Sequence, residues 1–141
     1  MKKVFILLVV LTLSGAVFAQ SPAGGSFILF PPNSANLRAV NTEQAVINQQ
    51  TFTQVARQLS ENPQTRVLVD GHANAVLKTN REEMNTLRPL SERRAEAAAN
   101  FLVNYFNIDR HRIIITGAGG GYPSSSTDGA LNRRVSFIII R

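Results

Sequence analysis

Three short stretches of the sequence carry polar side chains that could bind a charged ligand. One stretch follows an apolar run and contains Asp70, His72 and Asn74, another contains the adjacent pair Arg93 and Arg94, and the third, residues 132–135, opens the last predicted strand. Arginine forms planar, paired hydrogen bonds with carboxylates, whereas Asp and Asn oxygens accept hydrogen bonds from amines. Together these residue types predict a site for an anionic ligand that also bears an amine.

Catalytic and metal-binding chemistry is poorly supported by the same residues. His72 and His111 are the only histidines, and the sequence places no nucleophilic serine beside either one. The chain has no cysteine, which excludes disulfides, thiol catalysis and cysteine-based zinc sites. Residues 117–121 are rich in glycine, but Pro123 follows instead of a helix, so a phosphate cradle is not predicted. We expect a binding module and not an enzyme, with no cofactor and no metal.

The spacing of apolar residues predicts the elements that must position this site. Alternating runs indicate four strands, over residues 26–30, 65–70, 112–116 and 134–140. Helical spacing indicates two helices, over residues 43–60 and 91–106. The segments between are expected to be loops, with at most a helical turn near Glu82. The order β-α-β-α-β-β predicts an α+β fold in which two helices pack on one face of a small mixed sheet.

Each predicted helix has a polar side chain suited to cap its first turn. Asn41 or Thr42 is expected to cap the first helix, and Ser91 is expected to cap the second. Arg94 stands at the edge of the apolar face of the second helix, so it is expected to turn toward the sheet, while Arg93 is expected to be exposed. That apolar face is predicted to comprise Ala95, Ala98, Ala99, Leu102, Tyr105 and Phe106.

The first residues read as an export signal and not as part of the fold. A positively charged start, an apolar run and small residues after it indicate that residues 1–19 are a cleaved signal peptide. The apolar run is shorter than the roughly 20 residues of a membrane span, so no transmembrane segment is expected after cleavage. Residues 20–25 read as a flexible leader, which leaves one domain over residues 26–141. The net charge of +6 comes without a dense basic run, so no nucleic-acid partner is expected.

Four segments resemble the motifs of one protein family. Residues 69–74, 90–95, 114–119 and 132–135 look like those of the OmpA-like peptidoglycan-binding domain, which occurs in OmpA C-termini, peptidoglycan-associated lipoproteins and flagellar stator subunits. The resemblance covers residues 26–141. It implies a periplasmic module that binds the diaminopimelate, or an equivalent diamino acid, of the peptidoglycan stem peptide without a covalent bond. It further implies association with the outer membrane or cell wall, and other envelope proteins as partners.

The resemblance also assigns three residues to peptidoglycan binding. The family arginine that grips the ligand carboxylate corresponds to Arg94, and the loop after the first strand points to Asn33. The family aspartate that grips the ammonium corresponds to Asn74, which keeps an acceptor oxygen but lacks the charge. Loss of a charge-assisted hydrogen bond would weaken binding by roughly three- to thirtyfold.

Two functions therefore stay open. In the first, the domain tethers or organises the cell envelope by binding peptidoglycan, with a weakened or altered ligand preference because of Asn74. In that case Asp70, Glu82 or Glu83 is a candidate for the missing carboxylate. In the second, the domain has kept the OmpA-like fold, does not bind peptidoglycan, and acts as a structural or protein-interaction module.

Overall fold

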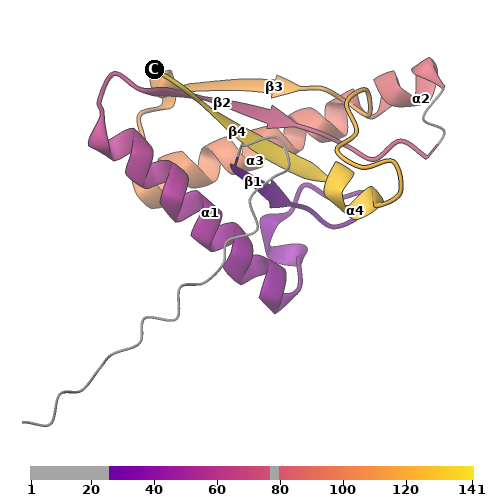
Figure 1. Ribbon diagram of the computed structural model, residues 1–141, viewed down its shortest axis with the longest axis horizontal. Coiled ribbons are helices and arrows are strands. Elements are labelled where there is room, and N and C mark those ends of the chain that lie inside the picture. The colour runs from indigo at the N-terminus through magenta and orange to yellow at the C-terminus, as the bar shows by residue number, and fades with distance from the viewer. Residues whose placement is uncertain (1–25, 77–79) are drawn as a thin grey trace, which may run out of the picture.

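The fold is a four-stranded sheet with its main helices on one face. The computed structural model describes residues 26–76 and 80–141 (Figure 1). The expected signal peptide and leader lie outside the described residues. The elements in chain order are β1 (Ser26–Leu29), the 3-10 turn η1 (Leu37–Ala39), α1 (Thr42–Glu61), β2 (Arg66–Gly71), α2 (Arg81–Thr86), α3 (Arg88–Phe106), the 3-10 turn η2 (Arg110–Arg112), β3 (Ile113–Gly117), α4 (Gly129–Asn132) and β4 (Arg134–Ile140).

The sheet is mixed, as the order of elements predicts. Its strand order is β1-β4-β2-β3, with β4 antiparallel to both β1 and β2, and β2 parallel to β3. The parallel pair is joined by a crossover through α3. Strands β2 and β3 therefore end at the same edge of the sheet, where α2 and α4 also lie (right in Figure 1). This edge brings together the polar stretches that the sequence singles out.

The hydrophobic core fills the space between α1, α3 and one face of the sheet. Strand alternation points Val67, Val69, Val135 and Phe137 at the helices, and none is more than 2% exposed. Full burial of an apolar side chain of this size contributes about 1.5–3 kcal/mol, so this layer is the main source of stability. The helices supply Phe52, Val55, Leu59, Ala95, Ala98, Ala99 and Leu102.

Helix α3 packs unusually close to β2 because Gly71 has no side chain. A Cβ atom on Gly71 would lie 1.9 Å from the carbonyl oxygen of Ser91 and 3.2 Å from the Cβ of Ala95. Small residues on both surfaces thus bring the end of β2 against the start of α3. None of the described helices is both long and apolar enough to cross a membrane.

The prediction that Ser91 caps the second helix is wrong. Helix α3 begins at Arg88, with Pro89 in its first turn. Proline suits that position because its fixed φ is helical and the missing N–H would have no partner there. The Ser91 hydroxyl instead donates to the carbonyl of Arg88 over 2.7 Å and accepts from the backbone N–H of Gly119 over 2.9 Å. Consequently Arg94 lies beyond the first turn of α3.

Other departures from the predicted elements are local. The segment 33–42 contains η1, in which Asn36 accepts a hydrogen bond from the backbone N–H of Arg38. The segment 75–89 contains α2, a full helix where only a turn was expected near Glu82. Tyr105 is not on the buried face of α3: it is 64% exposed, with its ring stacked on that of Phe101. Asn41 caps α1, as predicted.

Candidate functional site

Arg94 ties three parts of the chain together through backbone carbonyls. Its Nε donates to the carbonyl of Ser34 over 2.9 Å, Nη2 to that of Pro31 over 3.0 Å, and Nη1 to that of His72 over 2.8 Å. The guanidinium carbon lies 5.6 Å from the centre of the Phe30 ring. Helix α3 thus holds the loop after β1 against the end of β2.

Arg94 is a buried cation. Its side chain has 0% exposure, whereas Arg93 beside it is exposed, as the helical spacing predicts. Burial and, to a smaller extent, the nearby positive charge of Arg133 together lower the pKa of Arg94 to about 10. The guanidinium therefore stays protonated at neutral pH, and its cost of desolvation is offset by hydrogen bonds to carbonyl dipoles. In this arrangement a ligand reaches Arg94 only if the loop over residues 31–34 shifts.

Arg133 is the more accessible cation at the same edge. It is partly exposed, and its Nε donates to the carbonyl of Phe30 over 3.2 Å. The backbone N–H of Phe30 donates in turn to the carbonyl of Arg133 over 2.8 Å. A cavity of about 290 Å³ borders these residues and is lined by Pro31, Pro32, Ala130 and Arg133, among others. An anion in this cavity would lie beside a solvent-accessible guanidinium.

Asn132 fixes the position of Asn74. The Asn132 side chain is buried, and its Oδ1 accepts from the backbone N–H groups of Ser124 and Ser125 over 2.7 and 2.9 Å. Its Nδ2 donates to the carbonyl of Ser125 over 2.8 Å and to Oδ1 of Asn74 over 3.0 Å. All four hydrogen-bonding positions of the amide are therefore used. The loop before α4 is folded onto the segment after β2 through this one side chain.

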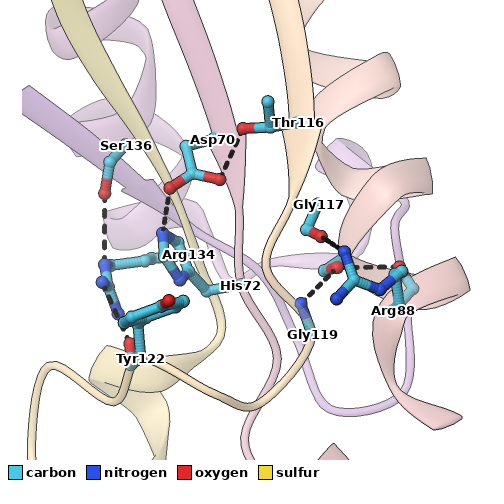
Figure 2. A network of polar contacts seen from close by, with 10 residues as sticks. Asp70, His72, Arg88, Thr116, Gly117, Gly119, Tyr122, Arg134 and Ser136 are labelled. Atoms are coloured by element: carbon cyan, nitrogen blue, oxygen red, sulfur yellow. Dashed lines mark hydrogen bonds and ion pairs between the residues drawn. The ribbon is translucent and has the colours of Figure 1, made fainter. Parts of the chain in front are cut away.

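The loop after β3 is held at the start of α3 by two further bonds. Arg88 Nη1 donates to the carbonyl of Gly117 over 3.0 Å, and Gly119 donates to the buried Ser91 hydroxyl (Figure 2). Gly119 has a φ of 61°, and a Cβ atom there would lie 2.4 Å from the carbonyl oxygen of Met84. Both the left-handed backbone and the contact require glycine at this position.

Asp70 and His72 form a separate polar network (Figure 2). His72 Nε2 lies 3.1 Å from Asp70 Oδ2, and the Thr116 hydroxyl donates to Asp70 Oδ1 over 2.7 Å. Burial alone would raise the pKa of Asp70, but the bonds from His72 and Thr116 and the charge of Arg134 outweigh it and hold that pKa below its usual value. Asp70 is thus held by His72, just after β2, and by Thr116 in β3.

The three residues assigned to binding lie around one edge of the sheet. Asn33 is exposed, has a φ of 50°, and precedes Ser34, whose carbonyl Arg94 binds. Asn74 is half-buried and follows His72, the other carbonyl partner of Arg94. Of the polar residues in this stretch, Asp70 and His72 pair with each other, whereas Asn74 pairs with Asn132.

The sequence grouped Asn132 and Arg133 with the predicted site but assigned neither residue an individual role. Their contribution depends on how residues 117–130 fold back onto the edge of the sheet, which no local spacing reveals. The candidates for a missing carboxylate differ in their surroundings. Asp70 pairs with His72, Glu82 is exposed on α2, and Glu83 Oε1 accepts from the backbone N–H of Val76 over 2.9 Å. Within the described residues, no three His, Cys, Asp or Glu side chains are grouped as a metal site would need.

Comparison with known proteins places this arrangement in a family. The model of the OmpA family matches residues 29–135, which contain all four motif segments. The chain belongs to the OmpA family. No curated protein matches this OmpA-family chain by sequence.

Solved structures share the fold of this OmpA-family domain. They include the peptidoglycan-associated lipoprotein from Burkholderia pseudomallei, with 20% identity and a TM-score of 0.63, covering 82% of this chain and 90% of that one. An outer membrane protein from Borrelia burgdorferi B31 has 25% identity and a TM-score of 0.58, covering 83% and 87%. The C-terminal domain of Helicobacter pylori MotB has 16% identity and a TM-score of 0.59, covering 81% and 84%. At identities this low, the structural matches establish the mixed α+β fold, and ligand binding has to be argued from the site.

Proposed function

We propose that this domain binds the stem peptide of peptidoglycan non-covalently in the periplasm and so tethers or organises the cell envelope. Domains of the OmpA family generally bind peptidoglycan and are typically not enzymes. The observation that carries the proposal is the convergence of all four motif segments on one edge, through Arg94, Asn132, Arg133 and Ser91. These hydrogen bonds hold the loops in fixed positions, and a binding surface requires loops that are held in this way.

The three assigned residues have different roles in this proposal. Arg94 shapes the loop over residues 31–34 and supplies positive potential. Three of its five N–H groups donate to carbonyls, two of them in this loop, so a shift of the loop makes N–H groups available to a ligand carboxylate. Asn74 contributes neutral hydrogen-bonding groups to the diamino acid, and Asn33 contacts it from the loop. Diaminopimelate, or an equivalent diamino acid, carries the carboxylate that such a positive edge attracts.

One observation favours the second candidate function, a domain that keeps the fold without binding peptidoglycan. The two central side chains of the edge already have partners: Arg94 is fully buried against carbonyls, and Asn74 is bonded to Asn132. In that case the edge would be a structural junction, and the protein would act through contacts with other envelope proteins.

Sedimentation with purified sacculi distinguishes the two candidate functions. The mature domain is expected to pellet with sacculi and to stay in solution without them. Arg133→Ala removes the accessible guanidinium and is expected to reduce the pelleted fraction, while Arg93→Ala, which changes an exposed arginine on the outer side of α3, is the matched control. A wild-type domain that remains in the supernatant at all sacculus concentrations would favour the structural function and reject the binding proposal.

A further inference from the structure

Two guanidinium groups stand at the proposed ligand edge without a carboxylate partner. Arg94 Nη2 and Arg133 Nε donate to consecutive carbonyls of one loop, those of Pro31 and Phe30. Across residues 26–76 and 80–141, neither arginine takes part in an ion pair. Their like charges are close enough for Arg133 to lower the pKa of Arg94, in addition to the larger effect of burial. The edge is therefore positive and repels a ligand cation.

The orientation of the Asn74 amide follows from a chain of hydrogen bonds. Asn132 Oδ1 accepts from two backbone N–H groups, those of Ser124 and Ser125, so its Nδ2 must be the group that faces Asn74. Because an amide nitrogen donates, the Asn74 atom beside it is the oxygen, Oδ1. The Asn74 Nδ2 group is thus the end turned away from Asn132, and it lies against Gly129 at the start of α4, where an added Cβ atom would approach it to 2.8 Å. Among the described residues it has no hydrogen-bond acceptor, so its N–H groups are the donors that a ligand at this edge would meet. A ligand ammonium, which is also a donor, does not match it.

The acidic side chains around this edge each accept hydrogen bonds from other parts of the chain. Asp70 is bonded within the network on β2 and β3. Asp128 Oδ1 caps α4 by accepting from the backbone N–H of Ala130 over 2.8 Å, and Glu83 Oε1 accepts from that of Val76 over 2.9 Å. A ligand ammonium at this edge would therefore meet the positive potential of Arg94 and Arg133 and the amide donor of Asn74, while each of these three carboxylates already accepts a hydrogen bond from the chain.

We propose that the domain prefers stem peptides whose diamino acid has an acylated side-chain amine over stems in which that amine is a free ammonium. The inference rests on the proposed peptidoglycan binding and names the form of the ligand. Acylation converts the ammonium into an amide, which removes the charge that Arg94 and Arg133 repel. It also adds a carbonyl oxygen that can accept from Nδ2 of Asn74. In a cell wall, the amine is acylated where two stems are cross-linked, so the domain would select cross-linked peptidoglycan.

Titration calorimetry with two synthetic stem peptides tests this preference. Both contain L-alanine, γ-linked D-glutamate and diaminopimelate, and they differ only in an acetyl group on the side-chain amine. The acetylated peptide is expected to bind the wild-type domain more tightly by roughly three- to thirtyfold. Asn74→Asp keeps the oxygen that accepts from Asn132 and adds a negative charge, so it is expected to reverse the order. Thermal melting of the variant verifies that it is folded.

The outcomes separate this inference from the proposed function. If the wild-type domain binds the free-amine peptide equally well or better, the inference is wrong while peptidoglycan binding stands. Loss of that free-amine binding in Asp128→Asn would then identify Asp128 as the acid that receives the ammonium. If neither peptide binds and the domain does not sediment with sacculi, both proposals are overturned.

Discussion

The guanidinium of Arg94 donates to the carbonyl of His72 over 2.8 Å, and this bond joins helix α3 to the end of β2. The residue that looks most like a ligand-binding arginine is thus also a structural clamp. Its three carbonyl partners lie in two segments, 22 to 63 positions before Arg94 in the chain. Any experiment that removes Arg94 therefore changes stability and site geometry together.

Arg94→Ala is expected to destabilise the domain by about 2–4 kcal/mol, because it deletes three charge-assisted hydrogen bonds and leaves buried carbonyls without donors. Urea unfolding followed by circular dichroism measures the change. Arg93→Ala, on the exposed side of the same helix, is expected to stay within about 0.5 kcal/mol of the wild type. Equal unfolding midpoints for the two variants would show that the carbonyl bonds of Arg94 contribute nothing to the fold.

The features of α3 divide into those that local pattern predicts and those it does not. Helical spacing predicts that Ala95, Ala98 and Leu102 are buried and that Arg94 turns inward, because one periodicity governs all four positions. The role of Ser91 could not be predicted, because its hydroxyl binds Gly119, which belongs to a loop that forms only after β3.

The candidate site is harder to predict than the sheet for the same reason. The bounds of β4 follow directly from its alternating pattern, and residues 134–140 are predicted and observed. The orientation of Asn74 instead depends on Asn132, which is 58 positions away in the chain. Such a long-range side-chain bond has no signal in either local sequence, so the sequence could name Asn74 without stating which of its groups a ligand would meet.

Asn132→Ala is expected to release the loop before α4 from the segment after β2. The change removes the four hydrogen bonds of one buried amide, which lowers the free energy of unfolding by about 1–3 kcal/mol. Amide hydrogen exchange followed by mass spectrometry should detect faster exchange at Ser124 and Ser125, with the β2 ladder unchanged. Unchanged protection of these two amides would contradict the role of Asn132 as the anchor of the loop.

Gly71→Ala is expected to be severely destabilising, because the new methyl group would overlap the carbonyl oxygen of Ser91. This overlap can be removed only if α3 moves away from β2, and that movement would open the hydrophobic core. Gly121→Ala is the matched control, since a Cβ atom there would lie at an ordinary 3.5 Å from the carbonyl oxygen of Ala118. Melting temperatures that fall by the same amount in both variants would mean that the contact between β2 and α3 is not close.

Acid is expected to destabilise the domain partly through Asp70. The pKa of this carboxyl is lower in the folded chain than in the unfolded chain, so the unfolded chain binds the proton first as pH falls. The stabilisation is present above about pH 4 and is lost as pH falls through the folded-state pKa. In Asp70→Asn, the unfolding free energy should depend less steeply on pH below about pH 4 than in the wild type. Identical slopes would exclude Asp70 as a source of acid sensitivity.

The most direct test of the proposed site is nuclear magnetic resonance of the ¹⁵N-labelled domain during titration with the acetylated stem peptide. If the stem peptide binds at the edge described above, the signals that shift will be the side-chain amide of Asn74, the backbone amides of Asn33 and Ser34, and that of Arg133. Signals from the outer side of α3, including Arg93, should not move. Saturable shifts confined to other surfaces, or no shifts at millimolar peptide, would contradict the assignment of this edge as the peptidoglycan site.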